Sequence, residues 1–148
     1  MKRGLLFLAL SALLVSAFYY LKYFVSDRTR LLFFTLESRL PYDETARRLA
    51  EQLKPLGLAG SYELPNGRVY LACLLPETEE LLSRLPELSY LLPCSVVLYR
   101  KRGSVYAALP REVVFLAQLK NELKREELSR LLELYAELRK AVREALSR

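Results

Sequence analysis

The fold is decided by the stretch CSVVLYRKRGSVYAALP, which occupies residues 94–110. Two runs rich in β-branched and aromatic residues flank a short basic segment that contains glycine, and this pattern is typical of a β-hairpin. A four-residue loop over 100–103 places six apolar or small residues on one face. These residues are Cys94, Val96, Leu98, Val105, Ala107 and Leu109. The sequence therefore predicts a hairpin with one buried face.

A second hairpin is predicted upstream, around Asn66-Gly67. Asn-Gly is the preferred pair for a two-residue type I′ loop. The resulting register collects apolar or small residues on one face, which we expect to be buried. This face contains Gly60, Tyr62, Leu64, Val69, Leu71 and Cys73. The opposite face carries Tyr70.

An aromatic surface is expected where the outer faces of the two hairpins join in one sheet. Its candidate residues for a ligand or partner are Tyr70, Val97, Tyr99 and Tyr106. An exposed apolar patch of this kind typically marks an interaction site. The alternative is that this face is covered, either by the segment that follows the apolar N-terminus or by the last helix.

Helices are predicted around the hairpins. Residues 44–54 and 77–85 have apolar residues at helical spacing, and the tail from Pro110 is helical in two pieces that break near 121–125. The last piece has an apolar stripe that faces either the core or another chain. Residues 34–148 are thus predicted to form one α/β domain of the α+β type, a two-layer sandwich of antiparallel hairpins with helices on one face.

The N-terminus predicts a membrane anchor over residues 1–25, followed by a linker and strand start over 26–33. Residues 4–21 carry no charge, and eighteen helical residues span about 27 Å, close to the hydrocarbon thickness of a bilayer. We expect residues 4–25 to form a single-pass transmembrane helix, with residues 26–148 outside the cytoplasm. The alternatives are a cleaved signal peptide and a buried helix.

The charge balance argues against a nucleic-acid partner. Three of the 23 Lys and Arg residues precede residue 26. Residues 26–148 therefore contain 20 basic and 17 acidic side chains and have a net charge of +3. A nucleic-acid-binding domain normally shows a concentrated basic face. The candidates for contact with anionic lipid are Arg28, Arg30, Arg100, Lys101 and Arg102. The last three alternatively form a solvated hairpin tip.

Catalytic chemistry is not indicated. The chain has no His, which excludes His-based triads and His-ligated metal sites. Its carboxylates form no evident acid–base pair, and its glycines are too isolated to form a phosphate-binding loop. We therefore expect neither an enzymatic activity nor a cofactor. The scarcity of Asn, Gln and Met fits a hot environment.

Cys73 and Cys94 are the two cysteines of the chain. Three interpretations are open for them: two small buried residues, a structural disulfide, or a thiol-based site that cycles redox states or binds Cu(I). The second interpretation is favoured if the body lies in an oxidising compartment.

Four parts of the sequence resemble the DUF302 family, a domain of unknown function. They are Cys73-Leu-Leu-Pro76, Leu92-Pro93-Cys94 with the strand that follows, Gly103-Ser-Val-Tyr106 and Pro110. The resemblance extends over residues 34–147. It implies a two-layer α/β sandwich and a homodimer, but no reaction. The function predicted from the sequence is a membrane-anchored, non-catalytic binding domain of unknown ligand, and the alternative is the thiol-based protein.

Overall fold

The computed structural model describes the backbone of residues 2–147 and the side chains of residues 4, 8–23 and 32–147. The chain divides into two compact units, residues 1–32 and 33–148. The first is a helix, α1 (Lys2–Leu32). This helix continues through the segment predicted as linker and strand start, and the first strand begins only at Phe33.

The described side chains in the middle of α1 are apolar and exposed, including Leu13, Leu14 and Phe18. Among the residues described, no helix is long and apolar enough to cross a membrane. Parts of the predicted span, residues 5–7 and 24–25, lie outside the described side chains, as do Arg28 and Arg30. The anchor therefore stays a prediction.

The second unit is an α+β domain built on a five-stranded antiparallel sheet with strand order β1-β5-β4-β3-β2. Its strands are β1 (Phe33–Glu37), β2 (Gly60–Leu64), β3 (Gly67–Ala72), β4 (Cys94–Lys101) and β5 (Ser104–Pro110). Its helices are α2 (Tyr42–Leu53), η1 (Lys54–Leu56), α3 (Pro76–Arg84), η2 (Pro86–Tyr90), α4 (Glu112–Leu119) and α5 (Arg125–Leu146). The predicted fold class of this domain is confirmed.

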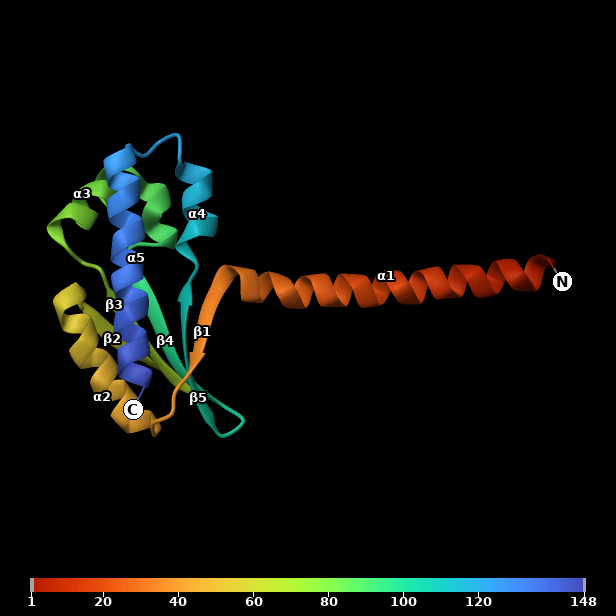
Figure 1. The fold of residues 1–148 in the computed structure, drawn as a ribbon, viewed down its shortest axis with the longest axis horizontal. Helices are drawn as coiled ribbons and strands as arrows, with labels where there is room; N and C mark the ends of the chain where they lie inside the picture. Colours follow the sequence, from red (N-terminus) through yellow and green to blue (C-terminus); the bar gives the residue numbers. More distant parts are fainter. Residues whose placement is uncertain (1, 148) are drawn as a thin grey trace. The chain divides into compact units, whose positions relative to one another are not determined.

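Helices α2 and α5 lie side by side over one face of the sheet (Figure 1). The predicted stripe of α5 is buried in the core at Leu131, Tyr135, Leu138 and Val142, so it faces this chain's own sheet. The Tyr135 hydroxyl donates a hydrogen bond of 2.6 Å to the carbonyl of Leu91. This bond satisfies a buried polar group and fixes α5 over the loop before β4.

Both hairpin loops differ from the predictions, although the residues of each hairpin, apart from Cys73, are divided between its two faces as predicted. The second hairpin pairs Lys101 with Ser104, so its loop is Arg102-Gly103, not 100–103. These two residues have φ angles of 53° and 80°, as a type I′ turn requires. The first hairpin pairs Leu64 with Gly67 and turns at Pro65-Asn66.

The position of Gly67 explains the shifted loop. A Cβ atom at this residue would lie 2.1 Å from the carbonyl oxygen of Leu98 and 2.9 Å from the Cα of Tyr99. Gly67 is therefore needed in β3, where the backbone of β4 approaches closely, and not in the turn.

The face of the first hairpin that meets the helices is the opposite of the one predicted. Tyr70 is only 2% exposed, and its hydroxyl donates to the carbonyl of Ala46 in α2 at 3.2 Å. Its assignment to the outer surface is wrong. Val69 and Leu71 alternate with it and therefore lie on the face opposite α2 and α5. The sequence could not decide between the faces because β3 is apolar on both.

At low pH, protonation of Glu127 should destabilise the start of α5. Its carboxylate accepts a hydrogen bond of 2.9 Å from the backbone N–H of Lys124 and pairs with Arg84. The Lys124 bond chiefly, and Arg84 next, lower the pKa of Glu127. A lowered pKa in the folded state contributes stability that is present at neutral pH and is lost as the pH falls below the usual glutamate value.

Urea unfolding of the wild type and of Glu127→Gln at pH 7 and pH 3 checks this effect. We expect the free energy of unfolding to decrease less between pH 7 and pH 3 in Glu127→Gln than in the wild type, because glutamine cannot titrate. Glu126→Gln, one residue away, is the control and should behave as the wild type. Equal losses in all three proteins would show that Glu127 does not contribute.

Candidate functional site

The face of the sheet opposite α2 and α5, which we call the open sheet face, carries a group of apolar side chains. Its apolar residues are Tyr62, Leu64, Val69, Leu71, Val97, Tyr99, Tyr106 and Ala108, and the same face also carries Thr35, Glu37 and Ser95, which pair with Ala108, Tyr106 and Leu71. Strand alternation places them together, because Val69 pairs with Val97 and Val97 pairs in turn with Ala108. Tyr62 is 53% exposed and Leu64 is 41% exposed, on the edge strand β2. Val69 is only 6% exposed, and Val97, Tyr99 and Tyr106 are half-buried, so the exposed apolar area of this face is greatest at its β2 edge.

Two of the predicted surface tyrosines lie at the centre of this face. Tyr99 and Tyr106 are directly opposite one another on β4 and β5, and their rings stack with centroids 5.6 Å apart. Partial burial, and then the neighbouring Tyr106, raise the pKa of Tyr99. Both effects favour the neutral phenol, which presents an apolar ring with a polar tip, as aromatic residues at interfaces do.

Val97 completes the predicted group, whereas Tyr70 does not belong to it. Tyr62, Leu64, Val69 and Leu71 also lie on this face, although the sequence predicts them to be buried. Their alternation was recognised, but the apolar set was assigned to the core. The information that distinguishes the faces is the contact of Tyr70 with α2, which is a tertiary contact.

The two cysteines form a disulfide between the end of β3 and the start of β4. Their Cα atoms are 5.4 Å apart, and both residues are fully buried. Cys73 follows β3 with a φ of 63°, which breaks the strand alternation and lets both Ala72 and Cys73 point away from solvent. Of the three interpretations, the structure thus contains the disulfide. Within the described part of the chain, no group of three or more acidic or cysteine residues could hold a metal ion.

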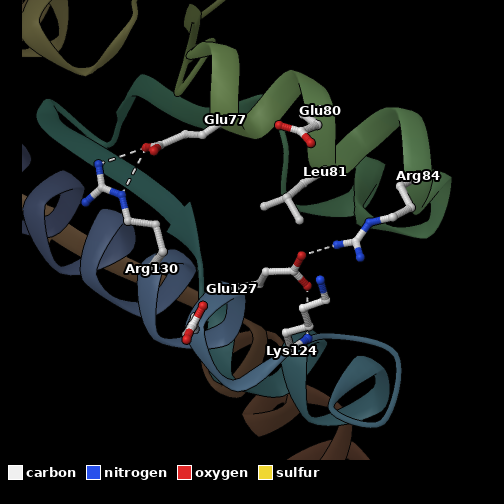
Figure 2. A pocket seen from close by; sticks show the side chains of 8 residues that line it. Glu77, Glu80, Leu81, Arg84, Lys124, Glu127 and Arg130 are labelled. Carbon is white, nitrogen blue, oxygen red and sulfur yellow. Dashed lines mark hydrogen bonds and ion pairs between the residues drawn. The ribbon is translucent and has the colours of Figure 1, made fainter.

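A charged hollow of about 450 Å³ lies between α3 and the start of α5 (Figure 2). Leu81 points into it between two ion pairs, Arg84–Glu127 and Arg130–Glu77. Its acidic and basic side chains are nearly equal in number. Because they already pair with one another across the two helices, the hollow is best explained as the seam that joins α3 to α5.

Arg100, near the end of β4, borders a groove of about 550 Å³ together with the segment before α2. The guanidinium of Arg100 lies 3.9 Å from the centre of the Tyr42 ring, a cation–π contact. Lys101 and Arg102 are exposed. The groove contains both acidic and basic groups, including Glu37, Asp43 and Arg39, and it shows no preference for an anionic ligand.

Comparison with known proteins places this domain in a family. No curated protein matches the chain at a significant level. The crystal structure of an uncharacterized conserved DUF302 protein from Bacillus stearothermophilus is similar, with a TM-score of 0.55 and 19% identity. The match covers 78% of this chain and 95% of that one. The sequence profile of the domain of unknown function DUF302 matches residues 56–146, and the chain therefore belongs to the DUF302 family.

Proposed function

We propose that the domain is a non-catalytic binding module that pairs with a second copy of itself through the open sheet face. The observation that carries the proposal is the apolar surface of that face, centred on Val97 and the stacked rings of Tyr99 and Tyr106. Removal of such a surface from water is favourable, since buried apolar area contributes about 25 cal/mol per Å².

A second copy suits this surface better than a small molecule does. Small-molecule sites are concave, whereas the hollow between α3 and α5 and the groove beside Arg100 are lined by other residues. A sheet face is broad, and two twisted sheets pack face to face about 10 Å apart. A two-fold arrangement would bring each copy's Val97 close to the other, with the tyrosine hydroxyls toward the rim.

We further propose that α1 tethers the domain to a membrane. The support for this proposal is the run of exposed apolar side chains along the helix, such as Leu13, Leu14 and Phe18, because an apolar helix surface of this extent needs a non-aqueous environment. The buried disulfide supports an extracytoplasmic position for the domain, since disulfides persist mainly in oxidising compartments. Flotation of the full chain with lipid vesicles tests the tether.

Sedimentation equilibrium of the fragment 33–148 tests the pairing. The fragment is one compact unit with its own core. We expect a dimer at micromolar concentration. Val97→Glu should raise the dimer dissociation constant about 100-fold, because it buries an unpaired charge at the centre of the interface.

Val113→Glu is the matched control, since it makes the same exchange at an exposed valine outside the open sheet face. It should leave the dissociation constant unchanged. Circular dichroism verifies that both variants are folded. A fragment that stays monomeric at high micromolar concentration would refute the pairing, and so would equal weakening by the two substitutions.

A further inference from the structure

We infer that the edge strand β2 pairs with β2 of a second copy, so that the two sheets join into one. The strand is the last of its sheet, and all five of its residues are exposed. The opposite edge, β1, is less open, because its second and fourth residues are half-buried. The inferred contact uses the backbone of an edge and is separate from the proposed pairing through the open sheet face.

The hydrogen-bond pattern leaves backbone groups of β2 without a partner strand. The N–H of Arg100 in β4 donates to the carbonyl of Asn66 at 2.8 Å. Because backbone groups alternate in direction along a strand, the next residue, Gly67, directs its own groups toward the last residue of β2. The same alternation in β2 turns the N–H and C=O groups of Ser61 and Glu63 away from β3. No strand of the described domain lies beyond them, so they form an open edge.

Protection of this edge against other strands is slight. Natural edge strands usually carry lysine or proline, or lie under a helix or loop. Strand β2 reads GSYEL and contains neither lysine nor proline. Its single charged residue, Glu63, is already paired with Arg68 of β3. The strand is therefore suited to accept another strand.

A second copy fits this edge in a self-complementary register. A two-fold axis between the two copies of Tyr62 makes the strands antiparallel. Ser61 of each copy then lies opposite Glu63 of the other, and these pairs exchange the open N–H and C=O groups. No like charges are directly opposed. Leu64 lies opposite Gly60 of the other copy, where a Cβ atom would meet nothing of its own chain within 4 Å, so the glycine leaves room for the leucine side chain.

Apolar side chains favour the same register. Tyr62 and Leu64 are 53% and 41% exposed, and both lie on the open sheet face. Tyr62 would lie directly opposite its counterpart in a non-hydrogen-bonded pair, in which Cα atoms are about 4.5 Å apart. Aromatic cross-strand pairs of this kind are favourable. The edge contact would thus cover the part of the open sheet face where apolar side chains are most exposed.

Cysteine cross-linking of the fragment 33–148 tests the inference, because the native cysteines are bonded to each other and buried. We expect Tyr62→Cys to form a disulfide-linked dimer under mild oxidation, since the expected Cα spacing of about 4.5 Å suits a disulfide. Face-to-face pairing cannot produce this link, because packed sheets are about 10 Å apart. Ser61→Cys is the matched control on the same strand. It would lie diagonally from its counterpart, about 7–8 Å away, and should stay largely unlinked.

A proline tests the backbone hydrogen bonds themselves. Ser61→Pro removes an N–H that faces away from β3, and proline is tolerated at such positions of edge strands. The substitution is combined with Val97→Glu, which weakens the proposed face contact. Sedimentation should show that Ser61→Pro raises the dissociation constant of the remaining edge dimer at least about tenfold, because each copy loses one backbone hydrogen bond. Circular dichroism verifies that the variant is folded.

Two results would overturn the edge pairing and leave the face pairing intact. The first is a Tyr62→Cys fragment that does not cross-link, with or without Val97→Glu. The second is equal cross-linking of Ser61→Cys, which would show random collision. A folded Ser61→Pro variant with an unchanged dissociation constant would also contradict the inference, because its dimer would not depend on the open N–H groups of β2.

Discussion

Replacement of Gly67 with alanine is expected to lower the free energy of unfolding by about 3 kcal/mol, the upper range for an overpacked site. The new Cβ would lie 2.1 Å from the carbonyl oxygen of Leu98, which belongs to backbone and not to a flexible side chain. Strand β4 would have to move away from β3. That movement would disturb the central strand pair of the sheet, including the pairing of Gly67 with Tyr99.

Gly60→Ala provides the matched control, since Gly60 lies in the same hairpin and a Cβ atom there would meet no other atom within 4 Å. This substitution should change the stability by less than about 0.5 kcal/mol, as is usual for surface positions. Urea unfolding of the fragment 33–148 measures both values. Equal stabilities of the two variants would show that β3 and β4 do not approach as closely as described.

Removal of the disulfide by the double substitution Cys73→Ala and Cys94→Ala is expected to cost about 3 kcal/mol. The bridge closes a loop with a sequence separation of 21 residues, and loops of that size give this value in the chain-entropy account. Alanine avoids placing an unpaired polar group at two fully buried positions.

Reductant is the control for the bridge. It should lower the stability of the wild type by a similar amount and leave the double variant unchanged. A thiol count in denatured, unreduced wild-type protein should give none. Two free thiols would contradict the bridge, and stoichiometric binding of Cu(I) by such a protein would favour the thiol-based alternative.

Local sequence patterns predicted most of the fold. The two hairpins, the four main helices of the domain and the buried stripe of α5 follow from residue alternation and helical spacing, which are local properties. The loops do not follow from these patterns. Asn66-Gly67 has the preferred turn composition, yet Gly67 lies in β3 because β4 leaves no room for a side chain there.

The candidate site was predicted in part for a similar reason. Tyr99, Tyr106 and Val97 alternate with a clearly apolar core face, so their outward position was evident. Strand β3 offers Val69 and Leu71 on one face and Tyr70 and Ala72 on the other. Only the packing of α2 on Tyr70 distinguishes them. The left-handed backbone at Cys73 likewise has no local signal, because non-glycine residues seldom adopt it.

The most direct test of the proposed pairing is the distance between the two copies of Val97. A nitroxide label at Val97→Cys in the fragment 33–148 reports this distance, because the native cysteines are bonded and buried. Face-to-face sheets about 10 Å apart predict strong dipolar broadening of the spectrum that disappears on dilution with unlabelled protein. A spectrum without broadening, at a concentration where the fragment sediments as a dimer, would show that the copies pair through another surface and would contradict the account.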